Sequence, residues 1–106
     1  MTFRAAFLLA ALCATIVPHQ AAAMPDATTM KRLETVGFYL GAADHCRIDI
    51  ETDRLRTYYE QRGALDPVVF GAVDRFVRAG SIVRHQPGSA HCGLAERILR
   101  AEEIID

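Results

Sequence analysis

A chain of 106 residues with 13 acidic and 12 basic side chains carries a formal charge of −1. Its acidic residues are scattered among the arginines, which excludes the clustered basic surface typical of nucleic-acid-binding proteins. The length suits one small domain, and no internal repeat, low-complexity tract or long linker divides it. The segments below are therefore interpreted as a targeting segment followed by a single domain.

Residues 1–23 have the layout of a secretory signal peptide. Arg4 supplies the positive charge, residues 5–17 form an apolar run that a proline ends, and three alanines precede the expected cleavage point. The run is shorter than the roughly 20 residues needed to span a bilayer. We expect cleavage between Ala23 and Met24, and a periplasmic or secreted domain, without a membrane span, made of residues 24–106.

The first predicted helix runs from Ala27 to Asp44. Asp26 precedes it as an N-cap, and apolar or small residues recur at spacings of three and four. Gly37 and Gly41 fall on the same stripe, and each weakens a helix by about 1 kcal/mol relative to alanine. We interpret both glycines as positions where a second helix approaches closely.

A second helix is predicted to start near Thr52, which is a candidate N-cap. Leu55, Tyr58 and Tyr59 are expected to face the interior. Gly63 is well placed to follow the last helical residue, because glycine readily adopts the left-handed conformation found there.

The third helix has the strongest start signal, with Asp66 as N-cap and Pro67 at the first helical position. Its apolar stripe is wide, which predicts the most buried helix of the domain; the stripe comprises Val69, Phe70, Val73, Phe76, Val77, Gly80 and Val83.

Ser89 can cap a last helix that carries Leu94, Ala95, Ile98, Ala101 and Ile105. With no convincing strand pattern, the fold class is all-α, a small four-helix bundle. The expected core includes Leu40, Val69, Val73, Phe76 and Ile98.

Two cysteines remain after the predicted cleavage, Cys46 and Cys92, because Cys13 leaves with the signal peptide. An even number of cysteines in an exported chain predicts a disulfide, and two cysteines allow one intramolecular pairing. The bond would join the end of the first helix to the start of the last. In the chain-entropy model, closing a loop of this length contributes on the order of 4 kcal/mol.

Acidic residues within residues 49–60 have the spacing of a calcium-binding EF-hand loop. Arg54, however, stands where the sharp turn of such a loop needs glycine. Acids near a helix N-terminus are also favoured by the helix dipole, so we interpret this stretch as a helix start. No metal or cofactor is predicted.

Each cysteine of the pair follows a histidine, which places His45 and His91 beside the same crosslink, with His85 as a possible neighbour. Zinc could use such ligands, but the spacings typical of zinc sites are missing and oxidation would remove the thiolates. The cysteines are also too far apart for a redox-active CxxC pair. The histidines could sense pH, since histidine changes charge between pH 5 and 8; solvated histidines at helix ends are the alternative.

No catalytic residue is predicted, because the serines lack a nucleophile-elbow context and no phosphate loop or dinucleotide fingerprint is present. The general plan, a short exported all-α chain with two cysteines, resembles the small acid-stress chaperones of the bacterial periplasm. The stretch RLETVGFYLGAADHC, residues 32–46, is similar to the first helix of small exported two-cysteine proteins of unknown function from alphaproteobacteria. Neither resemblance assigns a functional residue to this chain.

Three functions therefore stay open. The first is a non-enzymatic exported protein that binds another protein or an envelope component. The second is a pH-responsive holdase, whose bundle loosens when acid charges its histidines and neutralises its carboxylates. The third is an enzyme with an unrecognised site built from His45, His91 and nearby acids.

Overall fold

The computed structural model describes residues 24–106, and the signal-peptide prediction lies outside this range. These residues form helices and no strand, as the sequence predicts: α2 (Ala27–Gly41), α3 (Ala43–Cys46), α4 (Thr52–Gln61), α5 (Pro67–Ile82) and α6 (Ala90–Ala101). The four longer helices make a small bundle, and α3 adds a single turn between α2 and α4. Within residues 24–106, no helix has both the length and the apolarity required to cross a bilayer.

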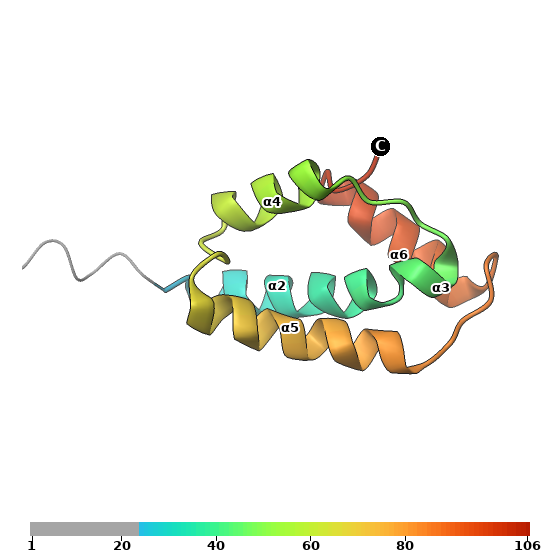
Figure 1. Cartoon of the computed structure of the whole chain (residues 1–106), viewed down its shortest axis with the longest axis horizontal. Helices are drawn as coiled ribbons and strands as arrows, with labels where there is room; N and C mark the ends of the chain where they lie inside the picture. The colour runs from blue at the N-terminus through green and yellow to red at the C-terminus, as the bar shows by residue number, and fades with distance from the viewer. Residues whose placement is uncertain (1–23) are drawn as a thin grey trace, which may run out of the picture.

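Helices α2 and α5 lie side by side and run in the same direction, while α4 and α6 run back across the molecule (Figure 1). Helix α2 is central, because it contacts both α5 and α6. The backbone of α4 lies farther from the other helices, and its tyrosine side chains bridge the distance to the core.

Glycines allow the close approach of α2 and α5. A Cβ atom added at Gly80 would lie 1.8 Å from the carbonyl oxygen of Phe38, and one added at Gly41 would lie 2.0 Å from that of Val77. At Gly37 the nearest atom, on the Val73 side chain, would be 3.0 Å away. The interpretation of Gly37 and Gly41 as packing positions is therefore confirmed.

Three of the four predicted N-caps are present. The Asp26 carboxylate accepts a hydrogen bond from the Thr29 amide at 2.7 Å, Asp66 caps α5, and the Ser89 hydroxyl oxygen accepts from the Cys92 amide. The prediction for Thr52 is wrong in detail: it is the first helical residue, and the residue before it caps α4 without a side-chain hydrogen bond.

The first helix also ends earlier than predicted. It stops at Gly41, and a turn at the buried Ala42 leads into α3. Helix α3 ends at Cys46, and the next residue, Arg47, adopts the left-handed conformation with φ 57°. Gly63, just after the C-terminal end of α4, has φ 69°, as expected for a glycine after the last helical turn.

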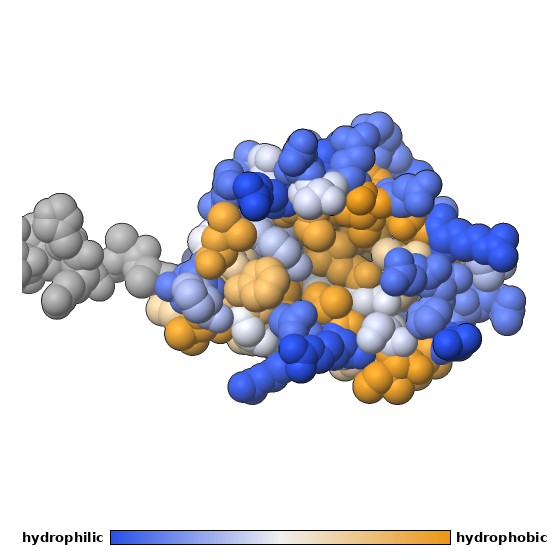
Figure 2. Space-filling model, viewed as in Figure 1, coloured by the Kyte–Doolittle hydropathy of each residue, from blue (hydrophilic) through white to orange (hydrophobic). Residues whose placement is uncertain are grey.

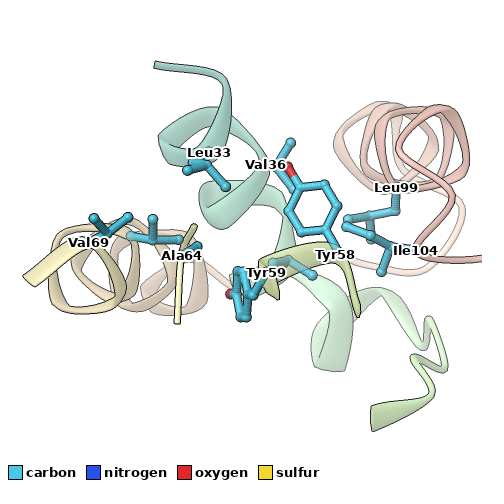
Figure 3. Packing of buried hydrophobic residues seen from close by; sticks show 10 residues of the cluster. Leu33, Val36, Tyr58, Tyr59, Ala64, Val69, Leu99 and Ile104 are labelled. Atoms are coloured by element: carbon cyan, nitrogen blue, oxygen red, sulfur yellow. The ribbon is translucent and has the colours of Figure 1, made fainter. Parts of the chain in front are cut away.

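The core lies where all four long helices meet (Figure 3). Tyr58 points between Val36 of α2 and the pair Leu99 and Ile104 at the end of α6, while Tyr59 extends toward the side of the core where α5 lies. The buried cluster comprises Leu33, Val36, Leu40, Tyr58, Tyr59, Ala64, Val69, Val73, Leu99 and Ile104. Adjacent tyrosines on one helix thus fill opposite parts of the interior.

The predicted core is corrected at Phe76, which is 38% exposed, although Val69 and Val73 are fully buried. The prediction that Phe70 belongs to the core stripe is also wrong, because its side chain is 44% exposed. The expectation that this helix is the most buried is wrong as well. The reason is geometric: only one narrow stripe of α5 faces α2, so apolar side chains on its flanks remain accessible. In α6 the deepest aliphatic side chain is Leu99, whereas Leu94 is exposed.

This correction predicts different costs for two truncations. Leu99→Ala should lower the free energy of unfolding by about 2–5 kcal/mol, because it leaves a cavity in the core. Phe76→Ala should cost only about 1 kcal/mol, since its ring is partly in solvent already. Urea denaturation monitored by circular dichroism measures both. Equal losses would mean that Phe76 belongs to the core after all.

Candidate binding groove

A groove of about 440 Å³, lined by apolar and polar groups, opens between α4 and the α2–α5 pair. One wall consists of α4 and the connection that precedes it; the other consists of α2, α3 and α5. Its aliphatic and aromatic lining comprises Leu40, Ala43, Ile48, Ile50, Leu55, Tyr59 and Val77. Figure 2 shows apolar side chains gathered in the middle of this face, between hydrophilic surfaces that belong to α4 and α5.

The local sequence explains how the first wall forms. Ile48 and Ile50 are two residues apart in a non-helical connection, a spacing that points both side chains to one side when the chain is extended. Leu55 and Tyr59 are four residues apart on α4 and therefore share one face of the helix. Ile48, Ile50 and Leu55 are half-buried and pack against the core. They are thus held in place while part of each side chain remains accessible.

The rim of the groove is acidic. Asp44 and Asp49 are exposed and line it, and within residues 24–106 no basic side chain does. Asp49, the first acid of the stretch with EF-hand spacing, thus lies with Asp44 beside aliphatic side chains. Such a combination suits a ligand that is apolar at its centre and positively charged at its edge.

His45 joins α3 to α5 at one end of the groove. Its Nε2 atom lies 2.9 Å from the carbonyl oxygen of Ser81, another lining residue, so the imidazole donates to the C-terminal part of α5. A carbonyl accepts only, and an imidazole with its proton on Nε2 can make this bond whether neutral or charged. His45 therefore has a structural role here, holding α3 against the end of α5.

His85 and His91 form a separate cluster. Their rings are stacked with centroids 3.7 Å apart, and the His91 ring also lies against Phe38 and Tyr39 of α2, at 6.0 Å and 5.4 Å. The Nε2 atom of His91 is buried and has no hydrogen-bond partner among the described residues. Burial, followed by the nearby His85, lowers the pKa of His91 below its usual 6.5. The structure thus brings together two of the three histidines considered as pH sensors.

A polar cluster that the sequence did not indicate joins α2 to the C-terminal ends of α4 and α6. The Glu102 carboxylate, only 6% exposed, is paired with Arg32 and, at 3.2 Å, with Arg62. The Arg62 guanidinium also lies 3.9 Å from the ring centre of Tyr58. Burial and the charge of Glu102 raise the pKa of Tyr58 to about 12. We interpret the cluster as structural, because its central carboxylate is already neutralised by two arginines.

This cluster could not be predicted from the sequence, because its members are far apart along the chain. The adjacent cavity of about 470 Å³ is lined by acidic and basic side chains in equal number. It therefore offers no net charge to a ligand, unlike the acidic groove.

Cys46 and Cys92 form the predicted disulfide, with sulfur atoms 2.01 Å apart and a sequence separation of 46. The bond connects α3 to the first turn of α6. The buried Ala42 and the half-buried Ile48 pack around it. Because Ile48 also contacts the main core and lines the groove, the crosslink holds the groove wall as well as the helices.

Residues 49–60, which have the acid spacing of an EF-hand loop, form a short connection followed by α4. Asp53 lies in the first turn of α4, as the helix-start interpretation requires, whereas Asp49 lies on the groove rim. In the described part of the chain, no three His, Cys, Asp or Glu side chains are grouped as a metal site would need.

Comparison with known proteins adds no identity: no family model, no curated protein and no solved structure matches this chain.

Proposed function

We propose that this protein is an exported, non-enzymatic binding protein whose groove between α4 and the α2–α5 pair holds a segment of another protein. The observation that carries the proposal is the groove itself, with its half-buried Ile48, Ile50 and Leu55 presented beside exposed carboxylates. Aliphatic side chains left accessible in a fixed concave surface are typical of binding sites.

The disulfide and the layout of residues 1–23 support export to an oxidising compartment such as the periplasm. A crosslink beside the groove would keep its walls in place outside the cell. The lining supplies aliphatic and aromatic contacts more than convergent polar groups, which favours binding over catalysis by the groove.

The proposal predicts that binding depends on the groove wall. Leu55→Ser replaces a half-buried aliphatic side chain with a small polar one and should reduce capture of envelope proteins from extract by the immobilised domain. Val68→Ser is the matched control, because Val68 is 70% exposed and does not line the groove. Quantitative mass spectrometry of retained proteins compares the two with wild type. If Leu55→Ser is folded and retains the same proteins at the same level, the groove is not the binding site.

A second candidate function, an acid-responsive holdase, is favoured by the His85–His91 stack. Protonating both rings at 3.7 Å would place like charges together beside Phe38 and Tyr39. Their repulsion would loosen the connection between α5 and α6 and expose apolar surface for a client protein.

For this candidate we expect stability to fall as the pH drops below about 6.5. His91 has a lower pKa folded than its usual 6.5, so the unfolded chain takes up the proton first and is favoured as the pH falls from that value toward the folded pKa. His91→Gln should reduce the difference in unfolding free energy between pH 7.5 and pH 5. His45→Gln is the control and should leave that difference unchanged. Denaturant titrations at both pH values test this, and an unchanged pH dependence in His91→Gln would exclude the stack as a sensor.

A further inference from the structure

We infer that the groove selects a basic segment: its partner presents a few aliphatic side chains next to lysine or arginine. This inference rests on the proposed binding function and specifies the chemistry of the partner. The sequence leaves another protein or an envelope component open as the partner, and the inference favours a protein.

Charge at the rim is the first reason. Asp44 and Asp49 are the charged side chains that line the groove, and both are exposed at its edge. Neither takes part in an ion pair or a side-chain hydrogen bond within residues 24–106. Their charges are therefore available to an incoming cation, and they would repel an acidic peptide.

Shape and apolarity are the second reason. A volume of about 440 Å³ falls within the range of roughly 300–1,000 Å³ found for ligand pockets. Leu40 and Val77 lie on one side and Leu55 on the other, so an aliphatic side chain entering between them would contact aliphatic carbon on both sides. A segment with only charged residues would leave this surface in water.

The third reason is the position of the carboxylates relative to the apolar lining. Asp49 lies between Ile48 and Ile50 in sequence, where successive side chains of an extended chain point to opposite sides. The isoleucines pack inward while Asp49 remains exposed. A cationic residue next to an aliphatic one in the partner would match this alternation.

An anionic membrane surface fits the same groove less well. Phosphate headgroups would meet two carboxylates and, among residues 24–106, no lining cation, so approach would be repulsive. A peptide with positive charges has the complementary pattern. The structure therefore favours a protein partner, and lipid binding becomes an outcome that the test can detect.

The test uses the domain of residues 24–106 with its disulfide intact and fluorescein-labelled twelve-residue peptides. Each peptide has a central Leu-Val-Leu-Ile run, flanked on both sides by lysines, by glutamates or by glutamines. Fluorescence anisotropy at low and at physiological salt gives the dissociation constants. The expected order of affinity is lysine, then glutamine, then glutamate, with the lysine peptide losing affinity as salt is added.

Variants connect the preference to the rim. The double variant Asp44→Asn with Asp49→Asn should weaken binding of the lysine peptide about fivefold and leave the glutamine peptide nearly unaffected. The matched control is Glu60→Gln with Glu96→Gln, which removes two exposed acids that do not line the groove and should change neither affinity. Circular dichroism and thermal melting confirm that each variant is folded.

Three results would overturn the inference. One is equal affinity for the lysine and glutamate peptides, and another is an unchanged affinity in the Asp44 and Asp49 double variant. The third is binding to phosphatidylglycerol vesicles in preference to the lysine peptide. If the three peptides bind equally and Leu55→Ser still weakens all of them, the groove binds apolar segments and only the charge preference is wrong.

Discussion

Gly80→Ala should destabilise the protein by about 3 kcal/mol. The added Cβ would lie 1.8 Å from the carbonyl oxygen of Phe38, a backbone atom that cannot move aside as a side chain can. Helices α2 and α5 must then separate, which weakens the packing of Val73 against α2. For a domain of this size, a loss of this magnitude corresponds to a melting temperature lower by roughly 12–24 °C.

Gly71→Ala is the matched control on the same helix. No atom of the described residues lies within 4 Å of the Cβ it would add, so only helix propensity should act. Alanine is favoured over glycine in a helix interior by up to about 1 kcal/mol, and this variant should be more stable than wild type. Opposite signs for the two substitutions would support the close contact; stabilisation by Gly80→Ala would show that α2 and α5 are farther apart.

Removing the disulfide should have an effect of similar size. Replacing Cys46 and Cys92 with alanine frees a loop with a sequence separation of 46 and should lower the free energy of unfolding by about 4 kcal/mol. The loss arises mainly because the unfolded chain gains conformations. Chemical denaturation of the double variant, compared with wild type under oxidising conditions, measures it.

Reductant and chelator separate a crosslink from a metal site in the same protein. Reductant should lower the melting temperature of wild type and leave the double alanine variant unchanged. A chelator should alter neither, because the sequence predicts that no ion is needed for folding. A melting temperature that falls with chelator and is indifferent to reductant would contradict the role given to the disulfide.

Features encoded by neighbouring residues could be predicted from the sequence. Asp66 followed by proline marks the start of α5 because both residues act within one turn. The cysteine pairing could also be predicted, since the predicted domain has only two cysteines. The start of α5 and the crosslink could therefore be predicted without knowledge of the fold, whereas the end of α2 could not.

Features that depend on how the helices face each other could not be predicted from the sequence. Phe76 belongs to the apolar pattern of α5, but the close contact made by Gly80 and Gly37 leaves its ring at the edge of the interface. The groove requires α4 to lie apart from α2, a distance set by the side chains of Tyr58 and Tyr59. The isoleucines at positions 48 and 50 were the one local signal, an apolar pair two residues apart in a non-helical stretch.

The position of bound peptide tests the central claim most directly. In a ¹H–¹³C methyl NMR titration with the lysine-flanked peptide, we expect the largest shift changes at Ile48, Ile50, Leu55 and Val77, which line the groove. The exposed Leu94 on α6, outside the groove, should stay nearly unchanged. Shift changes that centre on Leu94, or none at saturating peptide, would contradict the claim that this groove is the binding site.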